Sequence, residues 1–464
     1  MDKHQTSDGV TDNASRRSFM KTSALSLALA AAPLGGTAIA QERAASGLLG
    51  EELGERWVGT WATGPTGSAI PPAAAPMQFA NQTLRQIVHT SLGGSRVRVR
   101  FSNEFGTEPL TIGAARIALR GAGSSIVGGT DRALTFGGAA SITIPAGAPA
   151  LSDPVDLQVP ALADLAISIF LPQATTATTF HGSAFQTNYV TGGNATGAAD
   201  LSSPTTVTSW FFLTGVSVWT RRAGTIVALG DSITDGAASN LNANHRWPDI
   251  LARRLQRYQR LFDLGVVNVG IGGNRLLNPG NAVVAPNAGI GPLFGVAALA
   301  RFDRDVIAQP GVEGVIVLLG VNDLGHPVSI APASEEVSAD DLIQGFRQLI
   351  ARAHQQGIAI YGATITPFGV TTIPNYYTPA REAKRQAVNA WIRTSREYDD
   401  VIDFDAAVRD PAMPSRLRPD YDSGDHLHPN DAGLVAMGES IPLRPFARLI
   451  ASADEAVVAA AAVA

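Results

Sequence analysis

The stretch IVALGDSITDG, residues 226–236, begins with an apolar run of strand length and ends in a turn bounded by Gly230 and Gly236. A serine, Ser232, stands where the predicted strand ends. Serine is common in turns because its hydroxyl bonds to nearby backbone. A nucleophilic serine needs more: a base, an acid that orients the base, and donors for an oxyanion. The rest of the chain decides between these two interpretations.

The sequence from residue 224 to residue 450 alternates short apolar runs with helical stretches. The apolar runs are TIVALG, GVVNVG, GVIVLLG, GIAIYGAT and VIDF, and the helical stretches include WPDILARRLQRYQR and ADDLIQGFRQLIARAHQQG. Near-continuous apolar strands that alternate with helices predict a parallel sheet covered on both faces. Ligands of such sheets bind beyond the carboxyl ends of the strands, which is where Ser232 lies.

Residues 57–222 follow a two-residue period instead. In RVRVRFSN, residues 96–103, valines and a phenylalanine face one side and arginines the other, and DLAISIFLP has a similar pattern. Segments rich in glycine, serine, threonine and proline separate these runs. Many short strands with such turns predict a β-sandwich or jelly roll ahead of the α/β domain.

The first residues of the chain, 1–40, have the regions of a bacterial export signal in order. SRRSFMK, with the twin arginines Arg16 and Arg17, precedes a run rich in alanine and leucine that ends in Ala-Ile-Ala. This pattern resembles a twin-arginine signal and predicts a periplasmic or secreted protein. The run is too short, and too rich in alanine, glycine and proline, for a stable membrane span.

Composition excludes several classes of protein. Of the 464 residues, 45% are hydrophobic and 16% charged, which is typical of packed globular domains. The net charge of −5 argues against a nucleic-acid partner. The absence of cysteine excludes disulfides, thiolate metal sites and a cysteine nucleophile. With 8 histidines and no HExxH pair, no metal or other cofactor is predicted. Residues 451–464 are a low-complexity tail that carries no chemistry.

Polar residues follow the other predicted strands at the same edge as Ser232. Gly273 follows the second strand, Asn322 follows the third, and Asp425 and His428 follow the fifth. A backbone N–H and a side-chain amide from separate turns are candidate oxyanion donors. An Asp-x-x-His pair can bring a carboxylate against an imidazole and so orient a base. Each segment alone is commonly a turn, a cap or a surface loop, but all of them in order indicate a hydrolytic site.

These blocks resemble the SGNH (GDSL) hydrolase superfamily, which is named for its Ser, Gly, Asn and His. The matching segments are GDSIT, NVGIGGN, GVND and DHLHP. The resemblance implies a flavodoxin-like three-layer α/β/α fold and an ester hydrolase that needs no metal. It implies a catalytic triad of Ser232, Asp425 and His428, with the backbone of Ser232 and Gly273 and the amide of Asn322 as the oxyanion hole. One departure is His426, which stands where the family often has glycine.

The whole chain, with WVGTWATGP, LRQIVHTSLGG and VRFSNEFG, resembles a narrower two-domain secreted subgroup of acylhydrolases and aryl esterases, some associated with xylan degradation. This resemblance implies a small ester or an acylated carbohydrate as substrate. One alternative is a lipase-like or lysophospholipid hydrolase, with the insert from Leu276 to Pro292 lining an acyl groove. Another is a carbohydrate-binding protein with a vestigial hydrolase half. Acyl-chain length, the alcohol half, polysaccharide binding and oligomeric state stay open.

Overall fold

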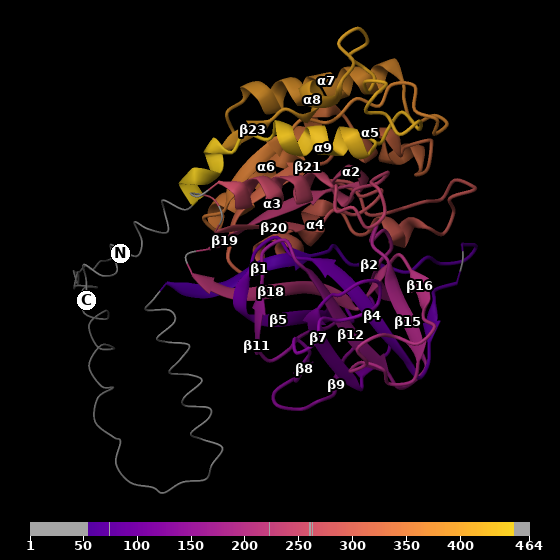
Figure 1. Ribbon diagram of the computed structural model, residues 1–464. Helices are drawn as coiled ribbons and strands as arrows, with labels where there is room; N and C mark the ends of the chain where they lie inside the picture. The colour runs from indigo at the N-terminus through magenta and orange to yellow at the C-terminus, as the bar shows by residue number, and fades with distance from the viewer. Residues whose placement is uncertain (1–53, 74, 222, 259–260, 262, 450–464) are drawn as a thin grey trace, which may run out of the picture. The chain divides into compact units, whose positions relative to one another are not determined.

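The computed structural model describes residues 54–73, 75–221, 223–258, 261 and 263–449 (Figure 1). The predicted export signal, residues 1–40, and the predicted tail, residues 451–464, lie outside the described residues. A β-rich half and an α/β half follow one another along the chain and belong to one compact unit. Whether they are separate domains, with the predicted boundaries, stays a prediction. No helix within these described ranges is long and apolar enough to cross a membrane.

The α/β half is built on one parallel sheet. Its strands are β19 (Gly224–Gly230), β20 (Leu264–Asn268), β21 (Val312–Leu318), β22 (Ala359–Ala363) and β23 (Asp400–Ile402). They lie in the order β20-β19-β21-β22-β23, so β20, the second strand of this sheet along the chain, lies at the edge beside β19, the first. This is the strand order of flavodoxin-like sheets, whose ligands bind at the carboxyl edge near the first and third strands. The parallel sheet predicted from the sequence is confirmed.

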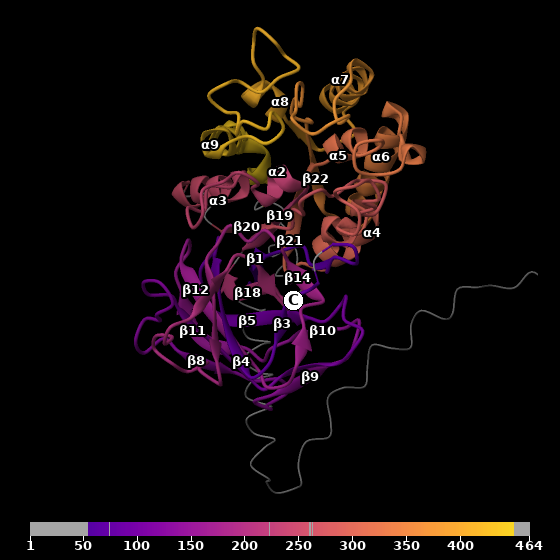
Figure 2. The ribbon, with the colours of Figure 1, turned by 90° about the vertical axis from the view of Figure 1, so that its right-hand side faces the viewer.

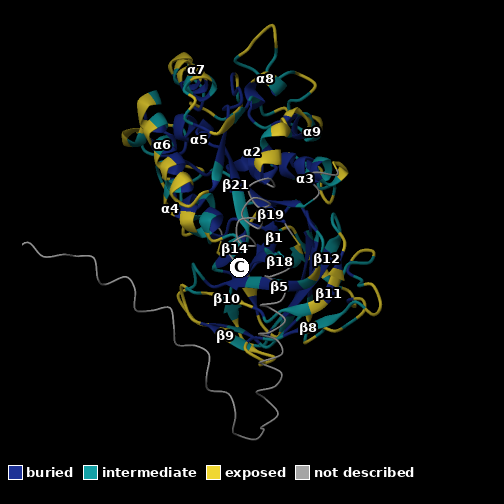
Figure 3. Cartoon of the chain, turned by 90° about the vertical axis from the view of Figure 1, so that its left-hand side faces the viewer, coloured by how far each residue is buried: buried dark blue, intermediate teal, exposed yellow. Residues whose placement is uncertain are grey.

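Helices cover both faces of this sheet (Figures 2 and 3). The α-helices are α2 (Ser232–Asp235), α3 (Trp247–Arg257), α4 (Ala298–Phe302), α5 (Val321–Gly325), α6 (Ala339–Gln355), α7 (Pro379–Thr394), α8 (Phe404–Val408) and α9 (Asp431–Ser440). Single turns of other helix types are η1 (Gly291–Phe294), η2 (Asp303–Ile307), η3 (Ala333–Glu335) and η4 (Arg444–Phe446). Helices α3 and α9 lie on one face, and α4, α6 and α7 on the other. The N-cap of α9 is Asn430, whose side chain accepts from the backbone N–H of Gly433.

The β-rich half is made of antiparallel strands. They are β1 (Glu55–Ala62), β2 (Thr66–Gly67), β3 (Gln78–Phe79), β4 (Gln82–His89), β5 (Gly94–Ser102), β6 (Leu110–Ile112), β7 (Ala114–Leu119), β8 (Arg132–Leu134), β9 (Ile142–Ile144), β10 (Pro149–Leu151), β11 (Val155–Val159), β12 (Asp164–Leu171), β13 (Thr175–Thr176), β14 (Thr179–His181), β15 (Asn188–Gly192), β16 (Thr205–Val207), β17 (Trp210–Phe211) and β18 (Leu213–Arg221). The two larger sheets have the orders β1-β18-β5-β10 and β16-β15-β4-β12-β7-β8.

Both of these larger sheets contribute to one apolar core. Val97, Val99 and Phe101 of β5 are 0% exposed and belong to the same cluster as Ile167 and Ile169 of β12. The alternation in β5 predicted from the sequence is confirmed, since its arginines face away from this core. That outward face lies toward the α/β half, since Arg98 and Arg100 line a cavity together with Gln309 and Pro310.

The two halves meet through buried backbone. The N–H of Gly59 in β1 donates to the carbonyl of Pro310 (2.9 Å) and to the hydroxyl of Thr225 in β19 (2.9 Å). The N–H of Val266 in β20 donates to the hydroxyl of Ser91 (2.9 Å). A Cβ at Gly265 would lie 2.7 Å from the carbonyl oxygen of Gly59, so β1 and β20 approach too closely for side chains between them. The β-rich half is therefore fixed against the edge of the parallel sheet.

Candidate active site

Ser232 lies at the junction of β19 and the single-turn helix α2. The N-cap is Asp231, whose carboxylate accepts from the N–H of Ile233 (3.0 Å). The turn ends at Gly236, which has a φ of 102° and donates its N–H to the carbonyl of Ser232. A Cβ at Gly230 would lie 2.0 Å from the hydroxyl of Thr234, so this sharp turn needs a residue without a side chain. Ser232 is thereby placed at the carboxyl edge of the sheet, with 9% of its surface exposed.

The structure brings together the serine, histidine and aspartate that the sequence singles out. The Oγ of Ser232 lies 2.8 Å from Nε2 of His428, and Nδ1 of His428 lies 2.5 Å from Oδ2 of Asp425. Because a carboxylate only accepts, Nδ1 carries the hydrogen and the lone pair of Nε2 faces the serine hydroxyl. This tautomer is the one that can accept a proton from Ser232.

The Asp425 carboxylate is also bonded by its own loop. Its Oδ1 accepts from the backbone N–H groups of Leu427 (2.9 Å) and His428 (2.8 Å). Burial alone would raise the pKa of Asp425, but the hydrogen bond and charge of His428, with these backbone donors, lower the pKa overall. Leu427 is buried in the apolar core of the α/β half, so it anchors the loop between the two polar residues. Asp425 is therefore ionised across the pH range in which an imidazole titrates.

His426 has a backbone conformation that explains why glycine is frequent at this position. Its φ is 59°, in the left-handed region, where residues other than glycine are disfavoured. Its Nδ1 lies 2.5 Å from Oδ2 of Asp422, and its backbone N–H donates to the other carboxylate oxygen. The bonds to Asp422 offset the strain, and the Asp-x-x-His spacing keeps its geometry.

Gly273 lies in the loop after β20, which packs directly against α2. A Cβ at Gly270 would lie 2.3 Å from the backbone nitrogen of Asp235. Gly273 has a φ of 73°, and a Cβ there would lie 2.2 Å from the ring of Phe294, so only glycine fits. Within the described part of the chain, the backbone N–H groups of Ser232 and Gly273 have no acceptor. Both N–H groups are thus available to a ligand.

Asn322, near the start of α5, has its amide fixed by two partners. Its Nδ2 donates to the carbonyl of Asn274 (2.9 Å), and its Oδ1 accepts from the hydroxyl of Tyr376 (2.7 Å). A backbone carbonyl only accepts, so the amide nitrogen must face Asn274. One N–H of Asn322 then remains beside the loop that carries Gly273.

Buried Arg301 joins the strand ends that carry these loops. Its guanidinium donates to the carbonyls of Gly230 (2.9 Å) and Val269 (2.6 Å) and to Oδ1 of Asn274 (3.0 Å). Asp305, one turn further along, accepts from the same guanidinium. An arginine in a helical stretch gives no sequence signal for this function, so Arg301 was missed.

Two further carboxyl groups are buried beside the candidate triad. Burial raises the pKa of Asp231 to about 7, although its bond from Ile233 acts the other way. Burial also raises the pKa of Asp323, whose oxygens accept from the N–H groups of Leu276 and Leu277. Both are structural acids: Asp231 caps α2, and Asp323 holds the start of the segment after Asn274.

Asp235 and His181 form a buried pair that joins the two halves, and the sequence analysis missed its role. Asp235 is the second-to-last residue of the stretch 226–236, and its position in the turn gives no sign of a distant partner. Nε2 of His181, in β14, lies 2.9 Å from Oδ1 of Asp235. The partners are far apart in the chain and come from different halves, so no local pattern could have revealed the contact.

A cavity of about 380 Å³ lies beside the loop that carries Gly273. Phe180, Ser183 and Ser209 line it from the β-rich half, and Leu293 and Phe294 from the α/β half. Phe294 also packs against the ring of His326, with ring centroids 5.3 Å apart, and lies close to Gly273. Within the described residues, no group of three or more His, Asp or Glu side chains could hold a metal ion.

In this site a serine hydroxyl bonds to an imidazole, and the imidazole bonds to a carboxylate, at the carboxyl edge of a parallel sheet. This arrangement is characteristic of serine hydrolases. Residues 228–434 match the model of the GDSL-like Lipase/Acylhydrolase family. The chain therefore carries a domain of this acylhydrolase family and is an enzyme of that class. No curated protein matches the chain.

Several solved structures are similar to about half of this chain. A putative lipolytic protein of the G-D-S-L family from Desulfitobacterium hafniense is 21% identical, with a TM-score of 0.33, over 48% of this chain and 98% of that one. A putative acylhydrolase from Bacteroides fragilis is 18% identical, with a TM-score of 0.34, over 48% and 88%. An acetylxylan esterase from Geobacillus stearothermophilus is 22% identical, with a TM-score of 0.34, over 49% and 94%.

Proposed function

We propose that the chain is a serine esterase in which Ser232 is the nucleophile, His428 the general base and acid, and Asp425 the orienting carboxylate. The supporting observation is the unbroken bonding from Ser232 through His428 to Asp425. His428 takes the hydroxyl proton as Oγ attacks the ester carbonyl, and then gives it to the leaving alkoxide. Water then attacks the acyl-enzyme with the help of the same imidazole, which releases the acid and restores Ser232.

The oxyanion is bound by the backbone N–H groups of Ser232 and Gly273 and the free amide N–H of Asn322. These donors are held in place before substrate arrives, by α2, by the left-handed Gly273 and by the bond from Tyr376 to Asn322. Donors that need no reorganisation during the reaction stabilise the transition state more than the ground state. No metal is needed in this scheme, because His428 activates both nucleophiles.

We propose short or compact acyl esters of carbohydrates or aryl alcohols as substrates. The cavity beside Gly272, at about 380 Å³, is at the small end of ligand sites. Phe180 and Phe294 supply aromatic faces, and Ser183 and Ser209 supply hydroxyls that can bond a polar group. Such a mixture suits a compact, partly polar substrate.

A lipase-like function is the second candidate, and the segment from Leu276 to Pro292 argues against it. Leu276 is buried in the core, and Val283 is the exposed large apolar residue of this segment. The backbone N–H groups of Val283 and Val284 donate to the carbonyl of Ile330. The segment is thus packed on the domain, and it offers no open apolar groove to a long acyl chain.

We further propose that the β-rich half is a sandwich that forms a wall of the substrate site, and that the precursor is exported by its twin-arginine signal. Residues of this half line the cavity beside Gly272, which supports the first proposal. The second rests on SRRSFMK. Replacing Arg16 and Arg17 by lysine should leave the precursor in the cytoplasm, and undiminished export would contradict it.

The test is Ser232→Ala. We expect p-nitrophenyl acetate hydrolysis to fall by roughly 10³-fold or more, because the nucleophile is lost while the fold is kept. A series of p-nitrophenyl esters of increasing chain length, beside acetylated xylan, tests the substrate class. Near-normal turnover by Ser232→Ala would overturn the mechanism, and a preference for long chains would favour the lipase-like function.

A further inference from the structure

A histidine of the β-rich half reaches the nucleophile's helix. His181, the last residue of β14, is 3% exposed, and its Nε2 lies 2.9 Å from Oδ1 of Asp235. On its other side, Nδ1 lies 2.9 Å from the carbonyl oxygen of Gly64. Its ring packs against the indole of Trp210, with ring centroids 5.6 Å apart. His181 is thus held from three sides, and both ring nitrogens are bonded.

The bonding pattern favours a charged imidazolium. The carbonyl of Gly64 only accepts, so Nδ1 of His181 must donate. Oδ1 of Asp235 lies 2.9 Å from Nε2, and a hydrogen on Nε2 completes this second bond. Burial alone would lower the pKa of His181, but the charge and hydrogen bond of Asp235, with the bond to Gly64, raise it overall. The charged Arg246, which lies nearby, opposes this rise.

Asp235 connects His181 with the oxyanion loop and the nucleophile. Its other carboxylate oxygen accepts from the backbone N–H of Gly272 (3.2 Å), the residue before Gly273. Asp235 is also the last residue of α2, the single turn that begins with Ser232. Asp235 therefore belongs to the helix that carries Ser232, and its carboxylate bonds to the loop that carries Gly273.

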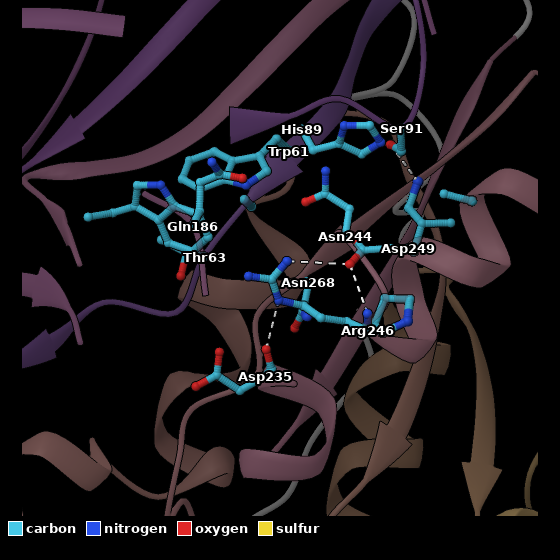
Figure 4. A pocket seen from close by; sticks show the side chains of 15 residues that line it. Trp61, Thr63, His89, Ser91, Gln186, Asp235, Asn244, Arg246, Asp249 and Asn268 are labelled. Atoms are coloured by element: carbon cyan, nitrogen blue, oxygen red, sulfur yellow. Dashed lines mark hydrogen bonds and ion pairs between the residues drawn. The ribbon is translucent and has the colours of Figure 1, made fainter. Parts of the chain in front are cut away.

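The side chain of Arg246 also fixes Asp235, by bonding to its main chain. Its Nε donates to the backbone carbonyl of Asp235 (2.9 Å), while its other nitrogens bond to Asp249 and to the carbonyl of Ala184 in the β-rich half. Figure 4 shows Arg246 beside Asp235 at a cavity that residues of both halves line. This cavity measures about 30 Å³, so it has room for only about two water molecules. The guanidinium of Arg246 is therefore enclosed where the two halves meet.

We propose that His181 is a positioning residue of the catalytic site: from the β-rich half it orients Asp235, and Asp235 orients Gly272 and so the N–H of Gly273. This inference rests on the proposed function, because Gly273 matters only if its N–H binds the oxyanion. His181 and Asp235 also line the cavity beside Gly272, but the role proposed for His181 is to position Asp235, not to act on the reacting atoms. An oxyanion donor acts mainly in the transition state, so the loss of His181 should lower kcat and leave KM nearly unchanged.

Two substitutions separate the two bonds of His181. In His181→Asn, the short amide can still reach the carbonyl of Gly64 but no longer Asp235. In His181→Gln, the longer amide can donate to Asp235 in place of Nε2. For p-nitrophenyl acetate we expect kcat to fall by about ten- to hundredfold in His181→Asn, with KM changed less than about twofold. We expect His181→Gln to stay within about threefold of the unsubstituted enzyme.

The matched control is His354→Asn, which removes a similar bond, from Nε2 of His354 to Asp399 (3.0 Å), on an exposed part of α6. Active-site titration gives the concentration of active enzyme from which kcat is calculated, and circular dichroism checks that each variant is folded. Unchanged kcat in His181→Asn, or equal losses in both His181 variants, would overturn the proposal. An active Ser232→Ala would instead show that the proposed function fails, whereas an inactive Ser232→Ala beside a fully active His181→Asn defeats only this inference.

Discussion

At the scale of single residues, the orientation of one amide governs the proposed oxyanion hole. Asn322 can turn an N–H toward the substrate because the carbonyl of Asn274 and the hydroxyl of Tyr376 fix which end of the amide is nitrogen. Burial raises the pKa of Tyr376 well above its usual value, so its hydroxyl keeps its hydrogen and donates at every pH of interest.

Removing the Tyr376 hydroxyl should leave the Asn322 amide less well oriented, so that it stabilises the transition state less. We expect Tyr376→Phe to lower kcat about tenfold and Asn322→Ala about 10²-fold, each with little change in KM. Steady-state kinetics on p-nitrophenyl acetate measures both. In the double variant, Tyr376→Phe should add nothing to Asn322→Ala, because the hydroxyl acts through the amide. Additive losses would show that Tyr376 acts by another route.

The raised pKa of Asp231 leads us to expect an unusual pH dependence of stability. Its pKa is about 7 when folded and about 4 when unfolded, so between these values the folded state binds more protons than the unfolded state. The free energy of unfolding therefore falls as pH rises from 4 to 7, by up to about 1.4 kcal/mol per pH unit from this group. Asp231→Asn keeps an oxygen for the N–H of Ile233 and should remove this fall.

Thermal unfolding across this pH range compares the two proteins. The Tm advantage of Asp231→Asn should grow as pH rises and disappear near pH 4. Other carboxyls titrate equally in both proteins, so the difference isolates Asp231. Parallel Tm curves would show that this carboxyl is not buried in its neutral form.

The candidate residues could be predicted from the sequence only where a local pattern marks them. Ser232 follows an apolar strand, and Asp425 and His428 share a fixed spacing, so they were predicted and lie together in the structure. His181 and Tyr376 act through contacts that join distant segments. No single-sequence period reports such contacts, because packing between elements decides them.

At the scale of elements, the loop after β20 depends on glycine in two ways. Gly273 combines a left-handed φ of 73° with the ring of Phe294 at 2.2 Å from any added Cβ. Gly357, after α6, has a similar φ of 70° but nothing within 4 Å of an added Cβ. Comparing alanine substitutions at Gly273 and Gly357 therefore separates the effect of backbone strain from the effect of a steric clash.

Gly273→Ala should displace the loop or Phe294 and lower kcat by about 10²-fold, because its N–H would leave the oxyanion position. Gly357→Ala should cost about 1 kcal/mol of stability through strain and leave kcat unchanged. Kinetics and thermal unfolding of both variants provide the measurement. An active Gly273→Ala would mean that this loop does not bind the oxyanion.

The elements themselves were largely predictable, and their partners were not. Apolar runs marked the strands of the parallel sheet, and helical periods marked α3 and α6. The alternating arginines of β5 indicated one face of a sheet. What covers that face could not be predicted, since the pattern of a strand does not report which element packs on it.

At the scale of the molecule, the β-rich half covers part of the catalytic half. A Cβ at Gly64 would lie 2.7 Å from Ile271, so the backbone of this glycine packs on a buried side chain of the loop after β20. Ala62 of β1 belongs to the apolar core of the α/β half. Arg304 pairs with Glu104 across the boundary (3.3 Å). Apolar burial, an ion pair and the hydrogen bond of His181 therefore all hold the two halves together.

Expressing residues 221–464 alone tests what this contact does. Without the other half, Ile271 and the outer face of β20 meet water, and Asp235 loses its histidine. We expect a fragment that aggregates or unfolds at lower temperature and hydrolyses p-nitrophenyl acetate at least about tenfold more slowly, since an apolar interface and a positioning contact are lost together. Acetylated xylan should be affected to the same degree. A stable fragment with full activity on the small ester and none on the polymer would instead make the β-rich half a separable binding module.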